Sequence, residues 1–140
     1  MDGVEQTGRA RTVNREKLQV ENLISDLNNP DSFRAKVFFP YLDLIKIRAC
    51  QKAFHPNAGF EILELGPKFF AIKRHHSEQV IFAITNISSS SHNVSLAELG
   101  ISDQTVDLIN GERIHGDLLE IKPYQYVWLS NSDNISNSRD

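Results

Sequence analysis

The residues best suited to chemistry lie near the start of the chain, where arginine recurs within a short polar segment. Arg9, Arg11 and Arg15 fall within seven residues, and Asn14 lies among them. Arginine binds phosphate or carboxylate groups through two parallel hydrogen bonds, and an asparagine amide adds further donors. Such a segment can hold a phosphate or a sugar hydroxyl. The residues alone favour a plainer interpretation, a solvated charged segment ahead of a helix.

The other titratable residues show no spacing that indicates a metal site or a catalytic pair. The five histidines include no pair at the i, i+4 spacing of a helical metal site, and His75 and His76, being adjacent, face opposite sides of a strand. Glycoside cleavage needs two carboxylates across one bond, and no such pair stands out. P-loop, G-x-G-x-x-G and G-x-S-x-G motifs are absent. We expect no metal, no cofactor and no independent catalysis.

The composition is typical of a globular protein, and we expect no binding to nucleic acid or membranes. The 140 residues suffice for one domain but not for a (β/α)8 barrel, and the net charge is −3. The first eleven residues lack the apolar stretch of a secretory signal. The single cysteine, Cys50, excludes an internal disulfide and suits a reducing compartment, so we expect a cytoplasmic protein. Cys50 is expected to be a buried thiol within a helix.

Helical periodicity precedes Pro56. A short helix is predicted over residues 17–27, and a second begins with Asn29 as N-cap and Pro30 in the first helical position, followed by Asp31 in the first turn. Pro40 predicts a kink or a restart within it. Apolar or amphipathic residues recur along this second helix at three- and four-residue spacing: Phe33, Val37, Tyr41, Leu44, Ile45 and Arg48.

Short strands are predicted after Pro56. Residues 69–74 and 79–85 form a hairpin, and Asn110-Gly111 marks another turn. Further strands are expected over residues 60–65, 94–96, 106–109, 118–121 and 126–129, with Trp128 in the core. The pattern predicts a mainly β fold with N-terminal helices (α+β): an antiparallel, Greek-key-like β-sandwich preceded by two helices. We expect a loop and helical segment at 1–57, a β-domain at 58–130 and a disordered tail at 131–140.

Several of these segments together resemble one enzyme group, that of the sucrose and glucosylglycerate phosphorylases within the α-amylase superfamily. Residues 8–17 resemble the loop after the last barrel strand, and residues 41–48 and 53–57 resemble the last barrel helix and its exit. The terminal β-domain of the superfamily is resembled by residues 80–86, 107–112 and 123–129.

The resemblance implies a parent enzyme that transfers glucosyl units between an α-glucoside and phosphate with retention. Its catalytic aspartate nucleophile, glutamate acid/base and aspartate stabiliser match no residue of this chain. Four residues would approach the mouth of the parent barrel and bind sugar or phosphate there: Arg9, Arg11, Asn14 and Arg15. A helix face would be buried between barrel and β-domain, and would favour self-association if exposed: Val37, Tyr41, Leu44 and Ile45.

The sequence therefore favours a non-catalytic accessory β-domain that stabilises a catalytic (β/α)8 barrel in the same chain or another. A standalone carbohydrate-binding β-sandwich is the first alternative, and it predicts exposed aromatic residues aligned on one sheet face for an α-glucan or small sugar. An assembly subunit for a separately encoded barrel is the second.

Overall fold

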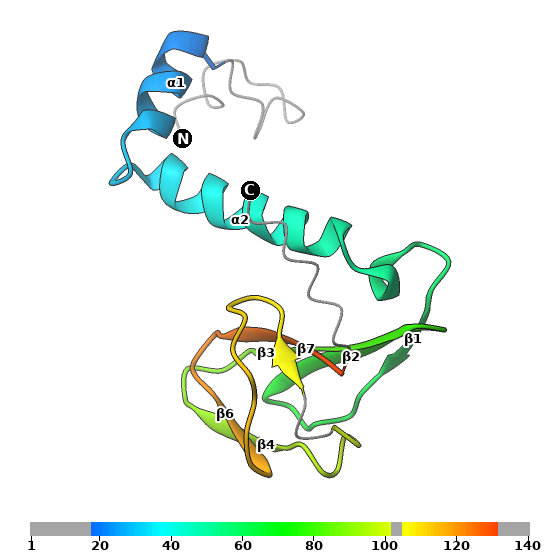
Figure 1. Cartoon of the computed structure of the whole chain (residues 1–140). Helices are drawn as coiled ribbons and strands as arrows, with labels where there is room; N and C mark the ends of the chain where they lie inside the picture. Colours follow the sequence, from blue (N-terminus) through cyan, green and yellow to red (C-terminus); the bar gives the residue numbers. More distant parts are fainter. Residues whose placement is uncertain (1–17, 102–104, 132–140) are drawn as a thin grey trace, which may run out of the picture. The chain divides into compact units, whose positions relative to one another are not determined.

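The computed structural model describes residues 18–101 and 105–131, which belong to two compact units. The first unit ends at Asp43 and holds α1 (Val20–Asn28) with the beginning of α2 (Phe33–Ala49). The second begins at Leu44 and holds the end of α2, the 3-10 helix η2 (Lys52–Phe54) and all the strands (Figure 1). The arginine-rich segment and residues 132–140 of the predicted tail lie outside the described residues.

Ser32, and not Asn29, caps the N-terminus of α2. The Ser32 Oγ accepts a hydrogen bond from the Ala35 N–H at 3.0 Å. Asn29 Oδ1 instead accepts from the Asp31 N–H at 3.0 Å, which holds Pro30 and Asp31 in a turn before the helix. The predicted cap and first turn were wrong because asparagine closes such local turns as readily as it caps helices, while the serine three residues later supplies the cap.

Pro40 lies inside α2 without a restart of the helix. A proline within a helix removes the hydrogen bond to the carbonyl four residues earlier, which here belongs to Lys36. Both residues are exposed, so water can satisfy that carbonyl, and the predicted restart does not occur.

Cys50 is exposed, which contradicts the predicted buried position. The helix ends one residue earlier, at Ala49, so Cys50 falls in the following turn, where its N–H donates to the Ile47 carbonyl at 3.2 Å. Cys50 therefore lies outside the helix in which the sequence had placed it.

In the part of the chain that the structure describes, seven strands form two antiparallel sheets, which confirms the predicted α+β class with two helices ahead of a mainly β region. The strands are β1 (Gly59–Ile62), β2 (Phe69–His76), β3 (Gln79–Asn86), β4 (His92–Ser95), β5 (Val106–Asp107), β6 (Leu118–Ile121) and β7 (Tyr126–Ser130). The large sheet has the order β1-β2-β3-β7-β5, and β4 pairs with β6 in the small sheet. The β2–β3 hairpin turns at Ser77-Glu78, inside the loop that the sequence predicted.

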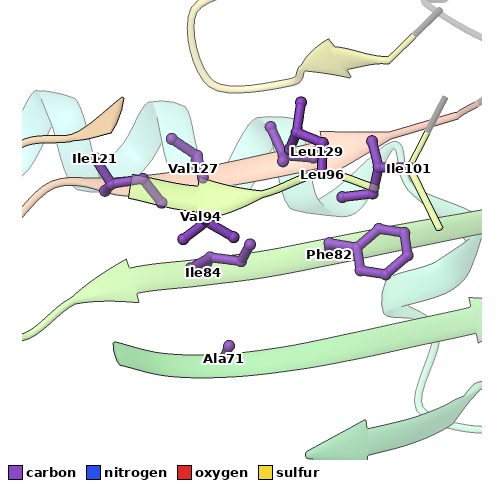
Figure 2. Close-up of a cluster of buried hydrophobic side chains, with 9 residues drawn as sticks. All are labelled: Ala71, Phe82, Ile84, Val94, Leu96, Ile101, Ile121, Val127 and Leu129. Atoms are coloured by element: carbon purple, nitrogen blue, oxygen red, sulfur yellow. The ribbon is translucent and has the colours of Figure 1, made fainter. Parts of the chain in front are cut away.

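The core lies between the inner face of the large sheet and the small sheet. Figure 2 shows Ile84 of β3 pointing toward Val94 of β4, with Val127 of β7 nearby. Alternation along β3 and β7 places every second side chain on this face. The buried cluster consists of Ala71, Phe82, Ile84, Val94, Leu96, Ile101, Ile121, Val127 and Leu129. Its burial is the main apolar contribution to the stability of the second unit.

Asn86, at the end of β3, is fully buried and joins three parts of the chain. Its Nδ2 donates to the carbonyl oxygens of Ser90 at 2.7 Å, Ile121 at 3.0 Å and Lys122 at 3.0 Å. Its Oδ1 accepts from the Ser88 N–H at 2.9 Å and from the Ser88 hydroxyl at 2.8 Å. One carboxamide thus fastens the loop after β3 to the end of β6.

Asp107, in β5, is a second buried polar side chain with only 2% of its surface exposed. Its Oδ1 accepts from the N–H groups of Ile109 at 3.1 Å and Trp128 at 3.0 Å. Burial raises the pKa of this carboxyl above its ordinary value, although the two hydrogen bonds act to lower it, and nearby Glu112 adds to the increase. The carboxyl therefore stabilises the β5 loop at an electrostatic cost.

Replacing Asn86 by aspartate is expected to destabilise the protein by about 3 kcal/mol, because three carbonyls lose their donor and face a buried carboxylate instead. The free energy of unfolding in urea measures this cost. Asn93→Asp, on the exposed side of β4, is the matched control and should change stability by less than about 0.5 kcal/mol. Equal costs for the two variants would contradict the role given to Asn86.

Asp107→Asn is expected to flatten the dependence of stability on pH. Because the folded pKa of Asp107 is raised, the native state binds more protons than the unfolded state, and stability falls as pH rises from about 4, the ordinary aspartate value, through the raised folded pKa. Asparagine keeps the Oδ1 acceptor without the charge. Unfolding free energies measured across this range should show the wild type losing stability relative to the variant. Parallel curves for the wild type and Asp107→Asn would refute the assignment.

Candidate functional site

The large sheet has a second face, opposite the core, that is also rich in apolar side chains. The register aligns Phe70 of β2 with Thr85 of β3 and Tyr126 of β7, and it aligns Ile62 of β1 with Ile72 of β2. Because strand residues alternate, these side chains share the face away from the core. We define the outer sheet face as Phe60, Ile62, Phe70, Ile72, Ala83, Thr85 and Tyr126.

Four large side chains of the outer sheet face are exposed. The exposed fractions are 62% for Phe60, 70% for Ile62, 56% for Phe70 and 39% for Tyr126. An antiparallel sheet with one face in water normally places polar residues there. A contiguous exposed apolar surface instead marks a contact with another protein surface or a ligand.

The η2 turn packs against one end of the same side of the sheet. The Phe54 ring packs on Trp128 with centroids 4.8 Å apart, and Ala53 and Ile81 are fully buried in this contact. Trp128 is thus half-buried beneath the chain's own η2, and it is not an exposed platform. Among the described residues of the second unit, no such cover lies over Phe60, Ile62 and Phe70, which are exposed.

Polar side chains hold η2 in place. Gln79 Oε1 accepts from the Ala53 N–H at 3.0 Å, and Gln79 Nε2 donates to Gln51 Oε1 at 2.6 Å. The Arg74 guanidinium donates to the carbonyls of Ala53 at 3.1 Å and His55 at 2.8 Å. These four bonds, which we call the η2 latch, fix the end of the helical segment to the β2–β3 hairpin.

One ion pair lies beside the latch. Lys52 hydrogen-bonds to the Glu78 carboxylate, and this bond, with the charge of Lys52, lowers the pKa of Glu78. Both side chains are exposed, so the pair contributes little to stability. Glu78 is therefore engaged by its partner and is not poised as a general acid.

A shallow hollow of about 470 Å³ opens next to η2. Its lining includes Arg48, Cys50, Lys52 and His55, and no aspartate or glutamate. The Arg48 guanidinium lies over the Phe54 ring, 5.0 Å from its centroid. Without carboxylates the hollow cannot carry out the two-carboxylate chemistry of glycosidases.

The structure describes some of the candidate residues from the sequence analysis and not others. Arg9, Arg11, Asn14 and Arg15 lie outside the described residues. On α2, Val37 and Tyr41 of the first unit are exposed, as is Ile45 of the second, whereas Leu44 is half-buried. The interface role of these four residues stays a prediction.

Sequence reasoning missed the outer sheet face, although one signal was present. In β3 the positions from Val80 to Ile84 are apolar without a break. Such a run indicates a strand covered on both faces, not one with alternating solvent exposure. The adjacent pair Phe69-Phe70 in β2 also indicates apolar residues on both faces, since adjacent strand residues face opposite sides.

The chemistry of this face favours a protein partner over a sugar. Phe60, Phe70 and Tyr126 are exposed aromatics aligned on one sheet face, as the carbohydrate-binding alternative predicts. However, only Thr85 and Tyr126 among the seven residues have a side chain that can hydrogen-bond. Sugar sites combine aromatic rings with several convergent polar groups, which an apolar protein surface does not need.

Neither metal-binding clusters nor membrane spans mark the described part of the chain. Within residues 18–101 and 105–131, no group of three or more histidine, cysteine, aspartate or glutamate side chains is placed to hold a metal ion. The helices found in the same residues are too short or too polar to cross a bilayer. The outer sheet face is therefore the main candidate site in this region.

Comparison with curated proteins identifies relatives of one kind. The glucosylglycerate phosphorylase of Spirochaeta thermophila is 37% identical over 89 residues, which are 62% of this chain and 15% of that protein. The glucosylglycerate phosphorylases of Allomeiothermus silvanus and Escherichia coli are 32% and 27% identical, each over 91% of this chain and 21% and 22% of their own lengths. The chain thus spans about a fifth of its relatives. No protein-family model matches it.

Solved structures share the fold at lower identity. Trehalose-6-phosphate hydrolase of Bacillus licheniformis aligns with a TM-score of 0.57 and 18% identity, over 76% of this chain and 20% of the hydrolase. Trehalulose synthase of Pseudomonas mesoacidophila aligns with a TM-score of 0.56 and 16% identity, over 76% of this chain and 19% of the synthase. The chain is therefore similar in sequence to a C-terminal portion of glucosylglycerate phosphorylases and in fold to enzymes of the α-amylase superfamily.

Proposed function

We propose that the chain acts as a non-catalytic accessory β-domain, which packs its outer sheet face against a catalytic (β/α)8 barrel and stabilises it. The observation that carries the proposal is the exposed apolar surface formed by Phe60, Ile62, Phe70 and Tyr126. The size of the relatives supports it, because about four-fifths of each relative lies outside the matched part and is available to cover this surface.

The energy available from such a contact is large enough for a stable complex. Covering a side chain the size of phenylalanine or isoleucine contributes about 2 kcal/mol, so four of them contribute several kcal/mol. The exposed face of α2 adds Val37, Tyr41 and Ile45 to the apolar surface that the chain offers. A stable interface of ordinary size buries about 800 Å² on each partner, and surfaces of this composition form its core.

The same proposal assigns roles to the rest of the chain. Residues 58–130 form the accessory domain, and residues 1–57 correspond to the end of the barrel. With the barrel present, Arg9, Arg11, Asn14 and Arg15 approach its mouth and bind sugar or phosphate, since arginine suits both. The parent reaction is glucosyl transfer to phosphate with retention. A cytoplasmic location is supported by the exposed, single Cys50 thiol, which suits a reducing compartment.

Catalysis by this chain alone is not part of the proposal. Asp107 is buried and bonded to backbone N–H groups, and Glu78 is paired with Lys52. Neither carboxylate lines the hollow beside η2. Retaining glycosyl transfer requires two carboxyl groups about 5 Å apart on either side of the sugar bond, which the relatives would supply from their remaining length.

The carbohydrate-binding alternative is favoured by the aligned aromatic residues on the outer sheet face. Titration of the chain with maltotriose separates the two proposals, because an accessory domain binds the barrel and leaves the sugar unbound. Saturable binding of maltotriose that Phe70→Ala abolishes would favour the alternative.

The chain is expected to bind a barrel supplied as a separate polypeptide. The probe is the glucosylglycerate phosphorylase of Spirochaeta thermophila without the portion that matches this chain, co-expressed with the full 140-residue chain. The two should co-purify, and the barrel should unfold at a higher temperature in the complex. Ile62→Lys and Phe70→Lys should each weaken the complex by at least about 2 kcal/mol, because apolar contact is lost and a charge is desolvated.

Leu118→Lys is the matched control for these variants. Leu118 is 62% exposed on β6 of the small sheet, close to the 70% of Ile62 on the outer sheet face. It should leave the affinity for the barrel unchanged. If Leu118→Lys weakens binding as much as Ile62→Lys, the outer sheet face is not the docking surface, and if the wild-type chain does not bind, the proposal fails.

Without a barrel, the chain is expected to form homo-oligomers through its apolar surfaces. Sedimentation equilibrium of the isolated chain measures this association. Tyr41→Lys tests the helix face and Ile62→Lys tests the outer sheet face, since each places a charge where apolar contact would form. Addition of the barrel should dissociate the oligomer by competition. A monomer at all concentrations would contradict this expectation.

A further inference from the structure

The turn between β6 and β7 holds a non-glycine residue in an unfavourable backbone conformation. Tyr124 has φ +57°, whereas the other positive φ angles in the described residues belong to four glycines: Gly66, Gly100, Gly111 and Gly116. The turn is closed by the Gln125 N–H, which donates to the Lys122 carbonyl at 3.1 Å. Pro123 occupies the second position and Tyr124 the third, where this type of turn requires positive φ and favours glycine.

Asn86 explains why the turn keeps this conformation. Its Nδ2 donates to the Lys122 carbonyl at 3.0 Å, and its backbone N–H donates to the Gln125 carbonyl at 2.9 Å. The Lys122 N–H also donates to Gln125 Oε1 at 2.8 Å. With both ends of the turn fixed to a buried residue, the residue at the third position adopts positive φ whatever its side chain.

The fold explains the conformation but not the choice of tyrosine. Glycine adopts positive φ without steric cost, so it suits this position better than tyrosine as far as the domain itself is concerned. The tyrosine side chain does not repay the strain by burial, because Tyr124 is 67% exposed. Backbone strain that the surrounding structure holds in place is typical of residues that serve a function.

We propose that Tyr124 is an anchor residue for the catalytic barrel, with its ring held in place by the strained turn before the partner arrives. This inference rests on the proposed function and extends it to a named contact. Tyr124 lies in the turn that leads into β7, two residues before Tyr126 of the outer sheet face. The partner is the barrel because that face is apolar and the relatives carry the additional length to cover it.

Tyrosine suits this role by its chemistry. Its ring brings a large apolar area, its hydroxyl can remain hydrated or bond to the partner, and tyrosine is enriched at the energetic centres of protein interfaces. A residue whose backbone is fixed in advance loses less conformational freedom on binding. The turn fastened by Asn86 provides that fixed backbone.

Three variants separate anchoring from a structural role. Tyr124→Gly removes both ring and strain, Tyr124→Ala removes the ring and keeps the strain, and Tyr124→Phe keeps the ring. In the isolated full chain, Tyr124→Gly should raise the midpoint of thermal unfolding, and the other two should leave it near that of the wild type. In binding to the Spirochaeta thermophila barrel described above, the Gly and Ala variants should raise Kd on the order of tenfold, and Tyr124→Phe should raise it less.

The opposite signs of the two measurements make the test specific, because a merely structural tyrosine would change folding and binding in the same direction. If the wild type binds, Ile62→Lys weakens binding and Tyr124→Gly does not, the anchor role is overturned while the accessory-domain proposal stands. If the wild type does not bind the barrel, both are overturned. If the chain instead binds maltotriose and Tyr124→Ala abolishes that binding, the partner is a sugar and the inference is wrong.

Discussion

The architecture of the second unit depends on the buried carboxamide of Asn86. Its two N–H groups serve three carbonyls, and its oxygen accepts from Ser88, so the loop after β3 and the end of β6 meet at a single side chain. Buried polar groups must be satisfied, and a network that is complete specifies one arrangement of the segments it joins. The two sheets are linked across the core by this network as well as by apolar packing, and the strained turn before β7 is held by the same residue.

Strand β3 lies at the centre of the large sheet and has apolar side chains on both faces, so the domain has an apolar outer sheet face in addition to its core. Phe82 and Ile84 face the core, whereas Ile81 packs under η2 and Ala83 lies on the outer sheet face. The η2 segment already covers one end of that side of the sheet. A partner that covers the remainder would complete a three-layer arrangement in which the large sheet is buried on both sides.

Local pattern was sufficient to predict the β2–β3 hairpin, strand β6 and the α+β class, because alternation and turn residues act over a few neighbouring positions. It failed where two local arrangements compete and where contacts between distant residues decide the structure. The cap of α2 at Ser32 required a choice between two local hydrogen bonds, and the exposure of Cys50 depended on where the helix ended. The five side-chain hydrogen bonds of Asn86 reach partners up to 36 positions away, which spacing cannot reveal. The arginine-rich segment was recognised by resemblance, and it lies outside the described residues.

Strand β1 forms one edge of the large sheet among the described residues, and its Phe60 and Ile62 are exposed. The only charge on this strand, Glu61, is 3.6 Å from Lys73 of β2 and is partly neutralised by it. Edges of this kind recruit further strands and lead to aggregation unless they are covered. If the chain functions as proposed, its synthesis in excess over the barrel would leave this edge uncovered and increase the demand on chaperones and proteases, so that the cellular level of the domain would follow the supply of the barrel.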